Sequence, residues 1–167
     1  KSGVYNLLTY NNAPVDPEIL DAFEAGLKTE FADHRVRLNV SAFYYDYKNI
    51  QVTQIVSGST VSINASSAKI KGIDASLTAR PTEHLTLKAG AAILDGKYGD
   101  FKNAPFFQPN GLPFGGNHSV PGDATGFDTV RTPKFTGNLS GDYMIPLANG
   151  DLDLVLSYYY NSGLNWD

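Results

Sequence analysis

Residues 22–45, AFEAGLKTEFADHRVRLNVSAFYY, decide the fold. In 22–31 the apolar residues occupy odd positions and the charged residues even ones, whereas in 36–45 the apolar residues occupy even positions. Side chains of a β-strand point alternately to opposite faces, so each half has one charge-free face and one polar face. The four residues 32–35 suit a tight turn. The segment therefore predicts two antiparallel strands that share an apolar face.

Four further stretches, 73–80, 85–94, 134–145 and 151–160, repeat this alternation. In all six stretches, the positions with apolar side chains carry no charged residue, although 18% of the chain is charged. We interpret these positions as facing lipid. The outward positions are Phe23, Ala25, Leu27, Thr29, Phe31; Val36, Leu38, Val40, Ala42, Tyr44; Ile73, Ala75, Leu77, Ala79; Leu85, Leu87, Ala89, Ala91, Ile93; Phe135, Gly137, Leu139, Gly141, Tyr143, Ile145; Leu152, Leu154, Leu156, Tyr158 and Tyr160. The charged residues on the other parity are Glu24, Lys28, Glu30, Arg37, Asp74, Lys88, Asp142 and Asp153.

Short and long connections alternate along the chain. The short ones are 32–35, 81–84 and 146–150, and the long ones are 46–72 and 95–132. Bacterial outer-membrane barrels have short periplasmic turns and long extracellular loops, so this alternation gives each strand a direction. In the first long connection, Ile50, Val52, Val61 and Ile63 around 57–60 predict a hairpin that projects beyond the barrel.

Outward aromatic residues collect at the two ends of the predicted strands. Phe23, Tyr44, Phe135, Tyr158 and Tyr160 fall at the predicted extracellular ends, and Phe31 and Tyr143 near the periplasmic ends. Aromatic girdles of this kind mark the two interfaces of a membrane barrel. A soluble antiparallel sandwich also alternates apolar with polar residues, but its strands are shorter and nothing makes its connections alternate in length.

Composition limits the remaining classes. The chain has 167 residues, no Cys and a net charge of −4, so it lacks a disulfide scaffold and the basic surface that a nucleic-acid partner requires. No apolar run approaches the roughly 20 residues of a membrane helix, whereas a barrel strand needs only about 9–11.

Several segments resemble the β-barrel of TonB-dependent outer-membrane receptors. These are PEILDAFEAGLKTEF at 17–31, RLN at 37–39, AFYYDYKNIQ at 42–51, NA at 64–65, AKIKGID at 68–74, LTARP at 77–81, DATG at 123–126 and TPKFT at 132–136. The resemblance covers nearly the whole chain and is weakest across 96–122. Each piece alone is common, but their order and spacing together are specific.

The resemblance implies an all-β fold, with antiparallel up-and-down strands forming part of a transmembrane β-barrel of about 22 strands. It also implies an N-terminal plug domain inside the barrel, energy supplied by TonB, and uptake of a scarce ligand such as a ferric siderophore, cofactor or oligosaccharide. Residues 1–167 contain about six membrane strands and a projecting hairpin, without a plug or a terminal aromatic strand after Trp166-Asp167. We therefore expect a partial barrel segment, in contact with outer-membrane lipid, whose open edges would self-associate in an isolated fragment.

Two groups of residues are candidate sites. Glu24, Lys28, Glu30, Arg37, Asp74 and Lys88 face the lumen, where they could contact a plug or substrate, or pair across strands and hold water. The long extracellular loop 95–132 presents aromatic and basic residues that could contact a ligand or pack the loop on itself. They are Tyr98, Phe101, Phe106, Phe107, Phe114, His118, Phe127 and Arg131.

The sequence shows no signal for an enzyme, cofactor or metal. His34, His84 and His118 lack ligand spacing, and Asp123 to Asp128 lacks the spacing of a calcium loop, which favours a turn. Active TonB-dependent import is the first hypothesis. A passive porin, an adhesion barrel or a surface receptor used by phage is the alternative, and the imported substrate cannot be named.

Overall fold

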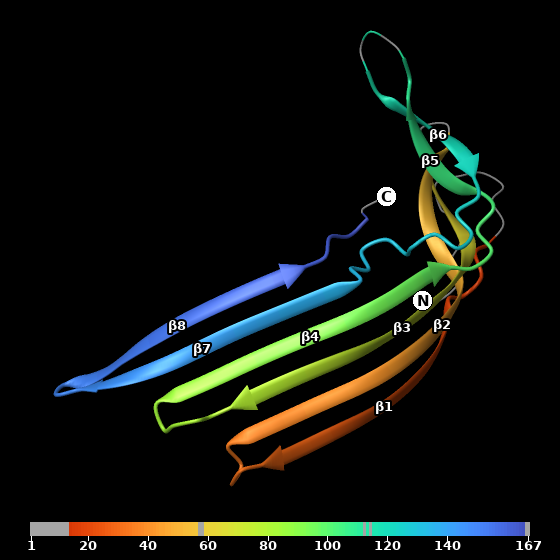
Figure 1. Cartoon of the computed structure of the whole chain (residues 1–167). Coiled ribbons are helices and arrows are strands. Elements are labelled where there is room, and N and C mark those ends of the chain that lie inside the picture. The colour runs from red at the N-terminus through yellow and green to blue at the C-terminus, as the bar shows by residue number, and fades with distance from the viewer. Residues whose placement is uncertain (1–13, 57–58, 112, 114, 166–167) are drawn as a thin grey trace. The chain divides into compact units, whose positions relative to one another are not determined.

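The computed structural model describes residues 14–56, 59–111, 113 and 115–165, whose regular elements are all strands. A six-stranded sheet has the order β1-β2-β3-β4-β7-β8, and β5 pairs with β6 separately (Figure 1). The predicted all-β antiparallel fold is confirmed. No helix in these ranges is long and apolar enough to cross a membrane. The strands are β1 (Ile19–Phe31), β2 (Val36–Val56), β3 (Ser59–Ala79), β4 (Leu85–Tyr98), β5 (Ala104–Pro109), β6 (Asn117–Gly122), β7 (Phe135–Leu147) and β8 (Gly150–Asn161).

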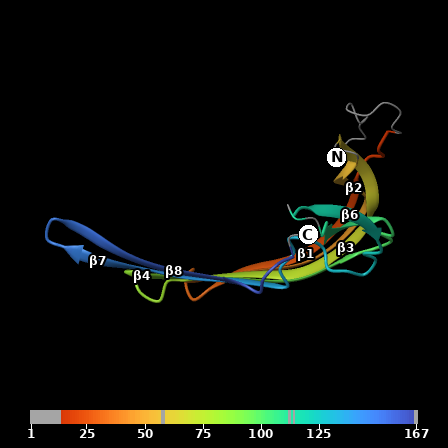
Figure 2. The same ribbon diagram turned by 90° about the horizontal axis from the view of Figure 1, so that it is seen from above.

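The chain divides into two compact units. Unit 1 comprises Lys1–Ala22, Tyr45–Ile70 and Gly96–Thr129. Unit 2 comprises Phe23–Tyr44, Lys71–Asp95 and Val130–Asp167. Within unit 2 the strands form a single layer when seen edge-on (Figure 2).

All six predicted membrane strands are present, and each is longer than predicted. The predicted excursion 46–72 consists largely of the ends of β2 and β3, which are neighbours in the sheet. This agrees with the predicted hairpin, although its turn at Ser57-Gly58 lies outside the described residues, as do the side chains of Val52, Val61 and Ile63. In unit 2, the β7–β8 turn contains Ala148 and Asn149.

The register of unit 2 places apolar positions opposite apolar positions. Across β4 and β7, Leu87 lies opposite Gly141 and Ala89 opposite Leu139. Across β7 and β8, Gly141 lies opposite Leu156. Because directly opposed residues share a face of a sheet, the parities assigned to these three strands merge into one charge-free face. We keep this name for the outward positions of 23–31, 36–44, 73–79, 85–93, 135–145 and 152–160, and call the opposite side the polar face.

Small and large residues interlock on both faces. On the polar face, a Cβ on Gly72 would come within 2.6 Å of the Phe43 ring and of the Ile93 carbonyl oxygen, so the ring covers a position that has no side chain. On the charge-free face, the Phe135 and Tyr160 rings lie 6.0 Å apart beside Gly137. Such aromatic–glycine neighbours help fix the register of a single-layer sheet.

Segment 95–132, which the sequence analysis treats as a long extracellular loop, contains regular structure. β4 continues to Tyr98, and the antiparallel pair β5–β6 lies within the segment. Pro105 lies opposite Pro121, and proline has no N–H for pairing with a further strand. The two prolines interrupt the alternation of apolar and polar residues by which a hairpin is predicted from sequence. They also restrict hydrogen bonding of β5 and β6 with further strands.

Candidate functional site

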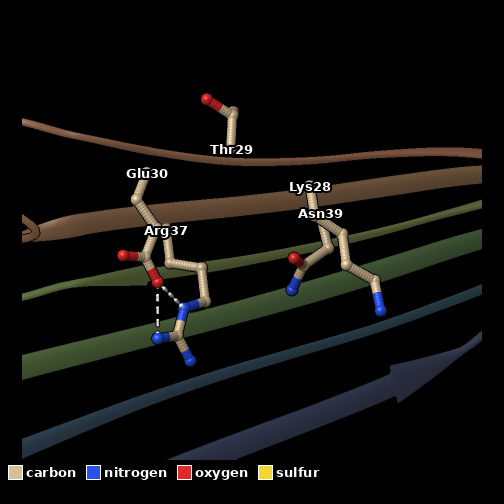
Figure 3. A pocket seen from close by; sticks show the side chains of 5 residues that line it. All are labelled: Lys28, Thr29, Glu30, Arg37 and Asn39. Atoms are coloured by element: carbon tan, nitrogen blue, oxygen red, sulfur yellow. Dashed lines mark hydrogen bonds and ion pairs between the residues drawn. The ribbon is translucent and has the colours of Figure 1, made fainter.

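The polar face of unit 2 has a shallow hollow at the end where β1 turns into β2. The hollow measures about 480 Å³ and is lined by Lys28, Thr29, Glu30, Arg37 and Asn39. Figure 3 shows the side chains of the four other residues on one side of the strands and that of Thr29 on the opposite side. This arrangement matches the alternation predicted for β1 and β2.

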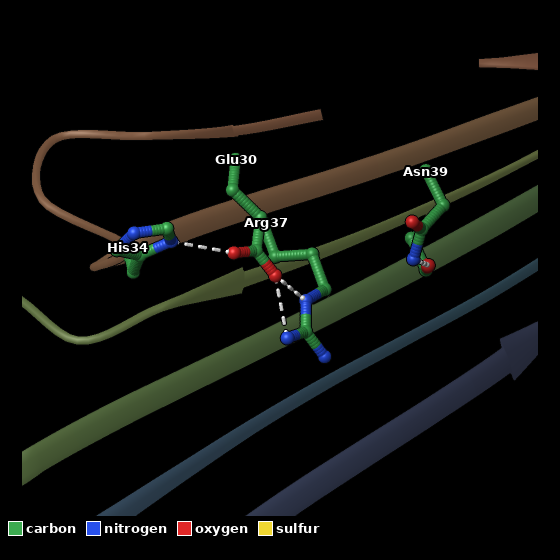
Figure 4. A network of polar contacts seen from close by, with 5 residues as sticks. Glu30, His34, Arg37 and Asn39 are labelled. Carbon is green, nitrogen blue, oxygen red and sulfur yellow. Dashed lines mark hydrogen bonds and ion pairs between the residues drawn. The ribbon is translucent and has the colours of Figure 1, made fainter. Parts of the chain in front are cut away.

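One carboxylate that lines this hollow, that of Glu30, contacts an arginine and a histidine. Arg37 Nε donates to Glu30 Oε1 at 2.5 Å, and Arg37 Nη2 lies at the same distance from that oxygen (Figure 4). His34 Nδ1 lies 2.7 Å from Glu30 Oε2. Because both carboxylate oxygens are engaged, Glu30 is held by its neighbours and Arg37 is neutralised.

Further along the polar face, hydrogen bonds cross from β2 to β3. Asn39 Nδ2 donates to Ser76 Oγ at 3.0 Å, and Ser41 Oγ donates to Asp74 Oδ1 at 3.0 Å. Asp74 therefore makes a cross-strand contact, as one of the two interpretations of the lumen-facing charges predicted. Asn39, Ser41 and Ser76 were not proposed as site residues, although their parity placed them on this face.

The remaining lumen-facing candidates are less constrained. Lys28 borders the hollow, Lys88 lies opposite Ser140, and Glu24 is exposed in the first half of β1. None of these three forms an ion pair within the described ranges. The structure thus brings Lys28, Glu30 and Arg37 together, and places Glu24, Asp74 and Lys88 elsewhere on the same parity.

Charged residues mark where the charge-free face ends. In unit 2, Lys71 Nζ lies 3.4 Å from Asp95 Oδ2, on the same parity as Ile73 and Ile93. In unit 1, Lys48 Nζ lies 2.8 Å from Asp21 Oδ2 and 3.8 Å from Asp46 Oδ2. The hydrogen bond with Asp21, and then the charges of both carboxylates, raise the pKa of Lys48. Charged pairs at these positions are typical of a boundary with polar surroundings, at the predicted extracellular end.

Unit 1 contains a small buried core built from segment 96–129. Phe101 is 5% exposed and packs with Ala104 and Ala124, with Tyr98 beside them. The Tyr98 and Phe101 rings are 5.3 Å apart in an edge-on arrangement. Phe101 was proposed as a ligand contact, but this burial makes it a packing residue, because the segment folds on itself as the alternative interpretation held.

Other aromatic side chains of this segment are accessible. Phe107 is 59% exposed and Phe127 is 55% exposed. The ring centroids of Phe127 and Phe106 lie 6.1 Å apart. His118 is held by a 2.9 Å contact of its Nδ1 with Asn110 Oδ1. Arg131 is exposed, with φ of 57°, and belongs to unit 2. Phe114 lies outside the described residues.

Asp123 begins a turn, as predicted in preference to a calcium loop. Thr125 N donates to Asp123 Oδ1 at 2.9 Å, and Phe101 N donates to Thr125 Oγ1 at 3.0 Å. Hydrogen bonds from the Thr125 side chain and backbone lower the pKa of Asp123. Over the residues that the structure describes, no group of three His, Cys, Asp or Glu side chains is placed to hold a metal ion.

Comparison with known proteins agrees with this geometry. A curated relative, the probable TonB-dependent siderophore receptor PiuA of Acinetobacter baumannii, is 29% identical over 85 residues. That match covers 51% of this chain and 11% of the relative, so the chain spans a small part of the relative's length.

A family match extends much further along the chain. Residues 2–167 match the family described as TonB dependent receptor-like, β-barrel. This family consists of outer-membrane receptors and transporters, which accounts for a sheet with one charge-free and one polar face. The chain therefore belongs to the TonB-dependent receptor β-barrel family and lies in the bacterial outer membrane.

Proposed function

We propose that this chain forms part of the wall and the extracellular surface of a receptor that imports a scarce ligand by TonB-dependent transport. The observation that carries the proposal is the continuous charge-free face of β4, β7 and β8 in a member of this family. A plug domain in the lumen and TonB in the periplasm are the partners that this function requires. Within the proposal, the polar face lines the lumen and the short turns face the periplasm.

A ferric siderophore is the ligand class that we favour. The support is the similarity to a probable siderophore receptor, together with the accessible rings of Phe106, Phe107 and Phe127 on segment 96–129. Aromatic faces can stack on flat or cyclic ligand groups. Tyr98 and Phe101 are left out of this contact surface because they pack inside the segment.

Uptake by the full-length receptor tests the transport proposal. Cells that carry only this receptor for the supplied ferric siderophore should accumulate labelled iron, and deletion of TonB should abolish the accumulation. Accumulation that persists without TonB would instead indicate a passive porin. Failure to accumulate any of a panel of ferric siderophores, with the receptor present in the membrane, would contradict the ligand class.

A surface substitution tests the contact residues. Phe107→Ala should weaken siderophore binding by about tenfold, if its ring contributes a stacking contact of about 1.5 kcal/mol. Lys102→Gln is the matched control, because Lys102 is exposed in the same segment and its ion pair among the described residues is with Asp100, at 3.5 Å. Equal affinities for the two variants and the unmodified receptor would exclude Phe107 from the site.

A further inference from the structure

The sequence contains two Asn-Gly pairs, Asn110-Gly111 and Asn149-Gly150, and their backbones are held differently. Gly150 is the first residue of β8 and pairs with Leu147 in the β7–β8 ladder. Gly111 lies beyond the end of β5, with a φ of 64°. Among the described residues, apart from its chain neighbours, no atom lies within 4 Å of the place that a Cβ would take, and its N–H donates no backbone hydrogen bond. The Gly111 nitrogen is therefore accessible, whereas the Gly150 backbone belongs to a sheet.

The Asn110 side-chain amide has defined neighbours at both of its polar atoms. Asn110 N donates to Gly116 O at 2.9 Å, so this residue continues the β5–β6 ladder one step beyond Pro109 and Asn117. Its Oδ1 lies 2.9 Å from His118 Nδ1. Because an amide oxygen only accepts hydrogen bonds, the imidazole nitrogen is the donor. Its Nδ2 lies over Gly116, where a Cβ would come within 3.2 Å of it, so the residue opposite has no side chain to cover this nitrogen.

We propose that Asn110-Gly111 is a self-modification site, at which the side-chain amide is lost through a cyclic imide and His118 promotes the reaction. The Gly111 nitrogen attacks Asn110 Cγ and closes a succinimide ring. The Cγ–Nδ2 bond breaks, and Nδ2 leaves as ammonia with the hydrogen that the Gly111 nitrogen gives up. Water then adds to one of the two ring carbonyls and opens the ring to aspartate or isoaspartate. The reaction needs water and no other reactant, and it does not depend on the proposed transport function.

His118 acts on the step that closes the ring. Negative charge develops on Asn110 Oδ1 when the nitrogen attacks, and a hydrogen-bond donor already placed at this oxygen stabilises that charge. The two reacting groups are adjacent in one chain, so no second molecule has to be brought to the site. Glycine favours the attack because no Cβ shields its nitrogen. At Asn149, ring closure would instead draw Gly150 out of its pairing in the ladder.

The reaction changes an exposed surface of segment 96–129. Either product adds one negative charge beside His118, and isoaspartate also adds a CH2 group to the backbone where Asn110 N pairs with Gly116 O. Phe107, 59% exposed, lies on the adjoining strand β5. The charge and the backbone at this end of the β5–β6 hairpin therefore change as the protein ages.

Peptide mapping of the full-length receptor, aged in detergent at neutral pH, tests the proposal. Mass spectrometry follows the conversion of amide to carboxylate at both sites, and electron-transfer fragmentation separates isoaspartate from aspartate. In the folded receptor we expect both products at position 110 and about tenfold slower conversion at position 149, since the ladder must open first. In urea the two positions should convert at similar rates, because the fold then protects neither pair.

Two variants test the role of the imidazole. His118→Leu removes the donor and should slow conversion at position 110 about fivefold, the effect of one lost hydrogen bond. His118→Gln keeps an N–H donor and should convert faster than His118→Leu. Hydrogen exchange at the Asn110 amide shows whether each variant keeps the hairpin.

Three results would overturn the proposal. They are equal conversion at positions 110 and 149 of the folded receptor, aspartate without isoaspartate at position 110, and undiminished conversion in His118→Leu. If the Asn110 amide loses its protection in the variants, the comparison of the two positions in the unmodified receptor decides.

Discussion

The β7–β8 ladder of unit 2 and segment 96–129 of unit 1 are stabilised in opposite ways. Every residue of β8 is exposed, including Leu156 at 79%, and order in this ladder comes from paired backbone groups. Segment 96–129 contains the buried core of Phe101, Ala104 and Ala124. The first region needs its surroundings to cover its apolar side chains, whereas the second covers its own.

This difference separates a sheet with an uncovered apolar face from a segment with its own core within one chain. A barrel sheet in a membrane is stabilised when lipid covers its outward side chains. Its sequence therefore needs only apolar residues at every second position of each strand. A segment in water needs buried apolar contacts and satisfied turn groups to become ordered. Substitutions in the two regions should therefore respond to different conditions.

The largest effect is expected from removing the core of segment 96–129. Phe101→Ala should destabilise the local fold of segment 96–129 by about 3 kcal/mol, because buried Phe-to-Ala changes remove packing and leave a cavity. Hydrogen exchange should then be faster at the amides of Tyr98 and Ala124, which are bonded to Phe127 and Phe101 carbonyls, while β7 and β8 keep their protection. Phe107→Ala is the control. Equal protection in both variants would show that Phe101 does not order the segment.

A somewhat smaller effect is expected from a charge on the wall. Leu156→Arg places a cation on the charge-free face in the middle of β8, which should cost about 2–3 kcal/mol in a bilayer. Ser157→Arg is the matched control, since Ser157 lies opposite Ser140 on the polar face. Denaturant unfolding of the receptor in lipid vesicles compares the two. If Ser157→Arg proved the more harmful, the assignment of the two faces would be reversed.

The smallest effect is expected in acid at the Asp123 turn. Hydrogen bonds from Thr125 lower the pKa of Asp123, so its contribution to local order is present above its unfolded pKa, about 3.9, and is lost as pH falls through the lowered value. The Thr125 amide resonance should follow this titration, with β7 and β8 unaffected. Asp123→Asn keeps an acceptor without the charge and should remove the step. If the titration step at the Thr125 amide persisted in Asp123→Asn, it would belong to another titratable group.

The sequence was sufficient to predict the two faces of the sheet, because the alternation of apolar and polar residues is local and periodic. Parity predicted the faces of Leu87, Leu139 and Leu156, and the register then placed them together on one face. The strand ends were predicted less well. Apolar alternation stops before these strands end, because backbone pairing needs no apolar face, as in β2 to Val56 and β4 to Tyr98.

The candidate sites depended more on contacts that no periodicity reveals. Parity placed Glu30 and Arg37 on one face, but their pairing at 2.5 Å also requires the turn at 32–35. In segment 96–129, the sequence could not separate the buried Phe101 from the exposed Phe107, since both are aromatic residues between turn-forming neighbours.

The sequence alone determined the strand alternation, the charge-free face and the alternation of short and long connections. These are properties of neighbouring residues, and lipid acts on them without any distant partner. The tertiary structure decided that His118 contacts Asn110, that Phe43 covers Gly72 and that residues 104–122 form a hairpin of their own. Each of these depends on which residues are brought together across strands, and side-chain periodicity specifies a face but not a partner.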